Sequence, residues 1–241
     1  MSGHSHWATI KRGKEAEDKK RGQIFSKLAR MISVAVREGG GDPETNSKLR
    51  IAIEKAKALN MPKDNIERSI KKGAGELEGE KMEEVIFEAF GPEGIAIIIE
   101  GITDNKNRTL GEIKQILNQN KGKLAGEGSV KWLFKRMGTV TINSQGQKAD
   151  KEGLELTAIE AGAEDIRWRN NLLEIYTKPE NLEKVKKNLE GKQIKVESAS
   201  LDWIAKETIA IEEKIKENCE KLFESLDEND AVQDIYSNLK E

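Results

Sequence analysis

The sequence contains few of the side chains on which most enzymes and secreted domains depend. Both of its histidines, His4 and His6, lie at the N-terminus, so no later segment offers an imidazole as a general base. The single cysteine, Cys219, excludes an internal disulfide framework and fits a reducing compartment. Glycine motifs for binding phosphates or dinucleotides are absent, and the carboxylates show no metal-ligand spacing. We therefore expect a protein that is not an enzyme and that has no cofactor and no metal site.

Long apolar runs are missing as well. The longest short run, Ile95–Ile99, has the length of a buried strand rather than that of a membrane span. No apolar segment follows the basic residues of the N-terminus, so the sequence shows no signal peptide. Charged residues make up 35% of the chain and its mean hydropathy is −0.67. These values are typical of a soluble globular protein, which we expect to be cytoplasmic and to have no membrane partner.

The charge is unevenly distributed along the chain, although the formal net charge is only −2. Residues 1–72 contain 17 lysines and arginines against 9 aspartates and glutamates. The remaining residues contain 24 basic and 34 acidic side chains. A basic N-terminal part joined to an acidic remainder favours contact between the N-terminal part and a polyanion such as nucleic acid.

The N-terminal part predicts three helices behind a polar, basic arm of residues 1–22. Apolar residues recur at helical spacing from Phe25 to Val36, and the run Gly39-Gly40-Gly41 ends that first helix. We expect Asp42 to cap a second helix with Pro43 at its first position. Because the apolar stripe of a single short helix cannot be buried alone, these helices predict a small bundle.

Beyond residue 80 the pattern changes to strands, and the order of elements predicts two α/β domains. Residues 138–204 have the β-α-β-β-α-β order of ferredoxin-like domains. Residues 80–137 lack a closing helix and strand, which residues 205–241 supply. We therefore predict an α+β protein with a basic arm and three-helix bundle over residues 1–79. One α/β domain follows, formed by residues 80–137 and 205–241, and the ferredoxin-like domain of residues 138–204 is inserted in it.

The candidate nucleic-acid-binding residues fall into three groups. In the arm, Trp7 either stacks on a base while the nearby cations Lys11, Arg12 and Lys14 contact phosphates, or packs on the helical bundle. The dense basic run of the first helix either neutralises phosphates or forms a solvated helix face. The turn at residues 103–109 offers amides and two cations to a phosphate, unless Asp104 and Asn107 only shape the turn. The candidates are Trp7, Lys11, Arg12, Lys14, Lys19, Lys20, Arg21, Lys27, Arg30, Lys106 and Arg108.

Several phrases of the sequence, taken in order along the whole chain, resemble the YebC family. The phrase Met-Pro-Lys-Asp-Asn-Ile-Glu-Arg at 61–68 is specific by itself. The others are Gly-His-Ser-x-Trp at 3–7, Lys-Arg-Gly at 20–22, Gly-Gly-Gly-Asp-Pro at 39–43, Thr-Asp-Asn-x-Asn-Arg-Thr at 103–109, Gly-Ser-Val at 128–130 and Asp-Ala-Val-Gln-Asp-Ile-Tyr at 230–236. His6 and Ser237 depart from the family pattern, where lysine and histidine are expected.

The resemblance implies a helical domain followed by two α/β domains, in a protein that regulates gene expression. Members of the family are known as transcriptional regulators that bind DNA, a mitochondrial relative activates translation, and some bacterial members help ribosomes through proline-rich stretches. The expected function is therefore that of a DNA-binding transcriptional regulator. The alternative is a translation factor that binds ribosomal RNA and has the ribosome as its partner. The residue pattern leaves both open, because no helix-turn-helix recognition helix stands out and a basic arm suits structured RNA as well as duplex DNA.

Overall fold

The computed structural model describes residues 18–240, with side chains from residue 21 onward. Its helices and strands form two compact units: unit 1 extends to Lys135 and resumes at Ala205, and unit 2 is Arg136–Ile204. The predicted fold class, N-terminal helices followed by two α/β parts, is confirmed. The separation of residues 1–79 as a domain of their own stays a prediction. No helix among the described residues combines the length and the apolar character needed to cross a membrane.

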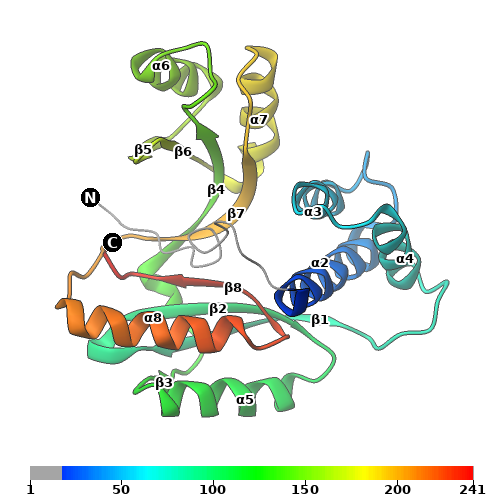
Figure 1. The fold of residues 1–241 in the computed structure, drawn as a ribbon, viewed down its shortest axis with the longest axis vertical. Helices are drawn as coiled ribbons and strands as arrows, with labels where there is room; N and C mark the ends of the chain where they lie inside the picture. Colours follow the sequence, from blue (N-terminus) through cyan, green and yellow to red (C-terminus); the bar gives the residue numbers. More distant parts are fainter. Residues whose placement is uncertain (1–17, 241) are drawn as a thin grey trace. The chain divides into compact units, whose positions relative to one another are not determined.

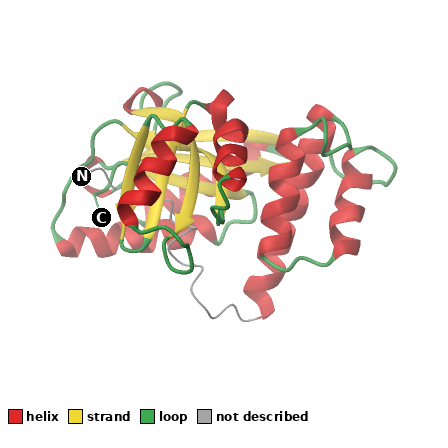
Figure 2. Ribbon diagram, turned by 90° about the horizontal axis from the view of Figure 1, so that it is seen from above, coloured by secondary structure: helices red, strands yellow, loops and turns green. Residues whose placement is uncertain are grey.

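Three helices open unit 1 and form the helical segment, the group of red helices at the right of Figure 2. They are α2 (Asp18–Gly39), α3 (Ser47–Ala58) and α4 (Lys63–Gly73). The apolar stripe predicted for the first helix is buried, and Leu28 and Ile32 share a core with Leu49 of α3 and Ile66 of α4. The helix ends at the predicted glycines, because Gly40 has a φ of 85° in the left-handed region.

The cap of α3 is Asn46, so the prediction of Asp42 was wrong. The Asn46 Oδ1 accepts the backbone N–H of Leu49 at 3.0 Å, and its Nδ2 donates to the carbonyls of Ala35 and Gly40, each at 2.8 Å. Asp42 instead shapes the preceding turn, where its Oδ1 accepts the N–H of Glu44 at 2.9 Å. Both residue types are good caps. Asn46 takes the position because it also ties the start of α3 to the end of α2.

The rest of unit 1 is a four-stranded antiparallel sheet, sheet A, with strand order β3-β1-β2-β8. Helices α5 and α8 lie on the same face of this sheet (Figure 1) and bury one continuous apolar core with it. Its elements are β1 (Glu83–Phe90), the 3-10 turn η1 (Pro92–Gly94), β2 (Ala96–Thr103), α5 (Lys106–Gln119), β3 (Lys123–Leu124), α8 (Glu213–Asp227) and β8 (Val232–Ser237). The C-terminal residues thus complete the sheet, as the count of elements predicts.

Cys219 on α8 belongs to this core and is fully buried. Burial, together with the nearby carboxylate of Glu220, raises the pKa of the Cys219 thiol to about 11. A neutral, enclosed thiol is a packing residue. Nowhere in residues 18–240 do three histidine, cysteine or acidic side chains gather in a way that could hold a metal ion.

Unit 2 has the ferredoxin-like arrangement predicted from the order of its elements. Its antiparallel sheet, sheet B, has the strand order β5-β6-β4-β7. The hairpin between β5 and β6 turns at Asn170, whose φ of 55° lies in the left-handed region that asparagine tolerates. The elements are β4 (Phe134–Asn143), α6 (Lys151–Ala161), β5 (Asp165–Arg169), β6 (Leu172–Thr177), the 3-10 turn η3 (Pro179–Asn181), α7 (Leu182–Gly191) and β7 (Ser198–Ala205).

Residues 130–134 differ from the alternating strand that Val130, Trp132 and Phe134 suggest. A 3-10 turn, η2 (Lys131–Leu133), comes first, and β4 begins only at Phe134. The turn leaves Trp132 at the surface, where 64% of the residue is exposed.

Candidate nucleic-acid interface

Most of the basic candidates at the N-terminus lie beyond the side chains that the structure describes. Lys19 and Lys20 are in the first turn of α2, where the backbone alone is described, and Arg21 follows them as an exposed residue. Outside the described residues are Trp7, Lys11, Arg12 and Lys14. The role of these residues stays a prediction.

Lys27 and Arg30, which helical spacing places on the outer side of α2, contact the C-terminal part of unit 1. The Lys27 Nζ donates to the Asp227 carbonyl at 2.6 Å and lies 2.9 Å from the Asp227 Oδ1. Arg30 donates to the carbonyl of Asp230. The two contacts each join residues 200 positions apart, so the periodicity of one helix does not reveal them. Lys27 is only 15% exposed and serves as an internal tether, whereas Arg30 also lines a groove.

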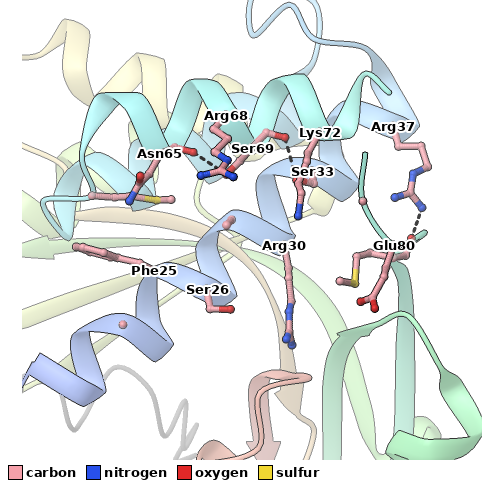
Figure 3. A pocket seen from close by; sticks show the side chains of 15 residues that line it. Phe25, Ser26, Arg30, Ser33, Arg37, Asn65, Arg68, Ser69, Lys72 and Glu80 are labelled. Atoms are coloured by element: carbon pink, nitrogen blue, oxygen red, sulfur yellow. Dashed lines mark hydrogen bonds between the residues drawn. The ribbon is translucent and has the colours of Figure 1, made fainter. Parts of the chain in front are cut away.

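That groove, of about 490 Å³, lies between α2, α4 and residues 79–82 (Figure 3). Four cations line it: Arg30 and Arg37 from α2, and Arg68 and Lys72 from α4. Among its described lining residues, Glu80 is the only acid. We call this feature the α2/α4 groove.

The floor of the α2/α4 groove is set by the close approach of the two helices. A Cβ at Gly73 would lie 2.5 Å from the Ser33 carbonyl oxygen and 2.7 Å from the Val36 Cβ, so only glycine fits there without a shift. The Ser33 Oγ donates to the Ser69 carbonyl at 2.9 Å, and the Ser69 Oγ donates to the Asn65 carbonyl at 2.7 Å. The Ser33 hydroxyl therefore joins the two helices, the Ser69 hydroxyl bonds within α4, and the cations carry the charge of the groove.

The four cations of the α2/α4 groove differ in how firmly they are held. Arg37 donates to the Met82 carbonyl, and Arg30 is held in the same way by its own carbonyl partner. A guanidinium has five N–H donors, so one such bond leaves the others for a ligand. Arg68 and Lys72 are exposed and, among the described residues, have no acidic partner. Cations that no carboxylate neutralises create the positive potential that attracts phosphates.

Arg37, Arg68 and Lys72 are absent from the candidates chosen from the sequence. Arg68 and Lys72 have the helical spacing of outward residues, and both are exposed on α4. Spacing could not show that α4 faces α2, because this depends on the close contact at Gly73 and on the bond from the Ser33 hydroxyl to the Ser69 carbonyl. The nearest signal is the family-like phrase at 61–68, which ends at Arg68.

The turn at Thr103–Thr109 joins β2 to α5, and its polar groups mostly bond to one another. Asn105, rather than Asn107, caps α5, since its Oδ1 accepts the N–H of Arg108 at 3.1 Å. The Arg108 guanidinium lies 2.5 Å from the Asp104 Oδ1 and 3.8 Å from a Glu112 carboxylate oxygen. Desolvation opposes ionisation of Asp104, but hydrogen bonds from the backbone and from Arg108 outweigh it and lower the Asp104 pKa.

The two cations of this turn are therefore unequal. The charge of Arg108 is matched by two carboxylates, whereas Lys106 is exposed and has no ion-pair partner within residues 18–240. A phosphate at this turn would have Lys106 as its main cationic contact.

Comparison with known proteins gives a consistent result over the whole chain. The family model described as the TACO1/YebC protein N-terminal domain matches residues 5–76, and the TACO1/YebC second and third domain matches residues 82–239. A "Probable transcriptional regulatory protein" of Halothermothrix orenii is 48% identical over 99% of this chain and 94% of its own length. A protein of that description from Caldanaerobacter subterraneus subsp. tengcongensis is 48% identical over 100% of this chain and 98% of its own. The crystal structure of a conserved hypothetical protein from Aquifex aeolicus matches with a TM-score of 0.88 at 44% identity, covering 97% of this chain and 96% of that one.

Proposed function

The chain belongs to the TACO1/YebC family, and on this basis we propose that it is a cytoplasmic, nucleic-acid-binding regulator of gene expression that holds its target through the α2/α4 groove and the basic arm. Relatives at 48% identity are named probable transcriptional regulatory proteins, which supports a role in regulating gene expression. The observation that carries the proposal is the groove itself, where four cations face one acid.

The α2/α4 groove suits the backbone of a nucleic acid better than its bases. Arg30 and Arg37 are positioned by carbonyl oxygens, so little side-chain freedom is lost when they meet a phosphate. Arg68 and Lys72 can adjust to the spacing of the chain that they bind. Contacts of this kind fix the position of a nucleic acid without reading its sequence. We therefore expect binding that depends strongly on salt and weakly on sequence at this site.

For the identity of the target, we propose duplex DNA, in line with the transcriptional names of the relatives. The alternative is a translation factor that binds ribosomal RNA. The position of the four cations in a groove, rather than on a projecting helix, favours the alternative, because a recognition helix that reads duplex DNA enters the major groove.

Crosslinking in cells tests the proposal and separates its two forms. The full chain is crosslinked with ultraviolet light and purified under denaturing conditions, and the attached DNA and RNA are both sequenced. Enrichment of promoter DNA supports the transcriptional form, and enrichment of ribosomal RNA supports the translational one. Failure to recover either nucleic acid above the level of an unrelated cytoplasmic protein would contradict the proposal.

A further inference from the structure

Trp132 is more exposed than any other large apolar side chain in the described part of the chain. An indole has a large apolar surface, and leaving it in water forgoes the free energy that its burial would contribute. Most exposed aliphatic residues need no explanation. A tryptophan exposed at 64% calls for one, especially when the backbone around it is held firmly.

The indole is held in place by bonds at its ring and at its backbone. Its Nε1–H donates to the Ser129 carbonyl at 3.0 Å, which fixes the ring relative to the loop. The Lys206 Nζ donates to the Trp132 carbonyl at 2.7 Å, and the Lys206 N–H donates to the Leu133 carbonyl at 2.9 Å. The 3-10 turn that carries Trp132 is thus attached to the chain where it re-enters unit 1.

A buried carboxylate binds the backbone of the loop that precedes Trp132. Glu88 of β1 is only 5% exposed and accepts three backbone N–H groups, from Gly128 at 2.6 Å, Val130 at 2.6 Å and Lys131 at 2.8 Å. Burial alone would raise the pKa of Glu88, but these three donors outweigh it and lower the pKa. The carboxylate clamp turns residues 128–131 away from a strand and places the indole at the surface.

Three lysines lie close to Trp132 along the chain or at its backbone. Lys131 and Lys135 are exposed on either side of it in the sequence, and the ammonium of Lys206 lies at its backbone carbonyl. An aromatic face beside lysines is the combination that proteins use for unpaired nucleic acid, where a base stacks on the ring and the lysines meet the flanking phosphates. A protein-binding tryptophan is more typically set in an apolar patch from which lysine is depleted.

We propose that Trp132 is a stacking platform for an unpaired nucleobase, with Lys131, Lys135 and Lys206 as contacts for the phosphates beside it. The inference rests on the proposed function and adds to it that the target contains a single-stranded or extruded nucleotide. In this arrangement Glu88 is a positioning residue, since it acts on the base only through the loop.

Three substitutions of Trp132 test the platform in the full-length chain. The probe is a fluorescein-labelled single strand of mixed sequence, about 16 nucleotides long to span a usual single-strand site, with the matching blunt duplex for comparison. Stacking on one base predicts that Trp132→Ala and Trp132→Leu weaken single-strand binding by about fivefold to a hundredfold. Trp132→Phe keeps an aromatic face and should remain within about threefold of the original affinity. None of them should change the salt slope, because stacking releases no counterions.

The matched control is Leu156→Ala, which removes an apolar side chain of comparable exposure, 60%, from α6 and should leave binding unchanged. Single-strand affinity retained in Trp132→Ala overturns the platform and indicates a protein partner for the indole. Equal loss in Trp132→Phe and Trp132→Ala also overturns it, since a structural role of the Ser129 bond then explains the loss. If the unmodified chain binds neither probe nor a structured RNA, the proposed function itself fails, which is a different result.

Discussion

In the helical segment, four cations line a groove whose described lining contains a single acid, whereas around sheet A the charges of Glu88, Asp104 and Arg108 have partners inside the chain. Arg68 and Lys72 show the first behaviour. Asp104, which pairs with Arg108, and Glu88, which accepts three backbone N–H groups, are charges with partners inside the chain. Charged side chains thus remain available to a ligand in one region and hold a loop in place in the other. What separates the two uses is whether the charge is already satisfied, and this is a property of the fold rather than of composition.

Removing two unpartnered cations of the groove should have the largest effect. The double variant Arg68→Ala/Lys72→Ala loses two phosphate contacts, and each charge-assisted hydrogen bond contributes about 1.5–3 kcal/mol. Binding should therefore weaken by roughly a hundredfold or more. The salt slope should fall by about two units for duplex DNA, or somewhat less for single strands. Fluorescence anisotropy over a series of salt concentrations measures both quantities.

The control for this variant is Lys184→Ala/Lys187→Ala, which removes the same charge from exposed positions on α7. Its binding should stay close to that of the original chain. Equal losses in the two double variants would mean that net charge, rather than the α2/α4 groove, governs binding, and the contrast between the two regions would disappear.

Glu88→Gln tests the opposite use of charge and should reduce stability. The amide offers one acceptor oxygen where the carboxylate has two, and its NH2 group faces the donors that the carboxylate accepts. We expect the free energy of unfolding to fall by about 2–3 kcal/mol, measured by urea denaturation, because a buried charge-assisted network is broken. Loss of the loop geometry should also weaken single-strand binding as Trp132→Ala does. An unchanged urea midpoint would contradict the clamp.

The same variant has a defined pH dependence. The folded-state pKa of Glu88 lies below its ordinary value of 4.5, so its contribution to stability is complete above that value and is lost as the pH falls through the folded-state pKa. The difference in unfolding free energy between the original chain and Glu88→Gln should therefore be constant near neutral pH and shrink in acid below 4.5. A difference that grows in acid would have the wrong sign for this carboxylate.

Single substitutions in the turn between β2 and α5 should have the smallest effects on stability and on the salt slope, and they compare a paired cation with an unpaired one. Asn105→Ala removes the cap of α5 and should cost about 1 kcal/mol of stability with no change in the salt slope. Lys106→Ala should lower the salt slope by about one unit if this lysine meets a phosphate. Arg108→Ala should change the slope less, because Asp104 and Glu112 already neutralise that charge. A larger effect of Arg108 than of Lys106 on the slope would reverse this order.

The sequence predicted well those features that depend on a pattern within one segment or on the order of the segments. The apolar period of α2, its glycine stop and the βαββαβ order of unit 2 follow from patterns within each segment, and the closing of sheet A by the C-terminal residues follows from counting the elements on both sides of unit 2. Failures occurred where a distant partner decides. Residues 130–134 alternate like a strand, but the Glu88 carboxylate draws their amides into a turn. Asp42 and Asn46 are equally good caps by type, and contact with the end of α2 selects Asn46.

The candidate site was predicted only in part for the same reason. A basic first helix and a basic third helix are evident from charge and spacing. That they face each other across a groove depends on Gly73 and on the pair Ser33 and Ser69, which no periodicity marks. Lys27 has the helical spacing of an outward residue, but it forms an ion pair with Asp227, which is far away in the sequence.

The insertion of unit 2 also bears on how the chain folds during its synthesis. Strand β8 pairs with β2 and is synthesised after every other described strand, so until it emerges β2 has an unpaired edge open to other chains. Unit 2 is complete before α8 and β8 emerge, and it can fold from contacts within its own residues. Its two ends leave along β4 and β7, which are neighbours in sheet B. Once it folds, the long flexible loop between β2 and β8 shortens, and the entropy lost when β8 joins the sheet becomes smaller.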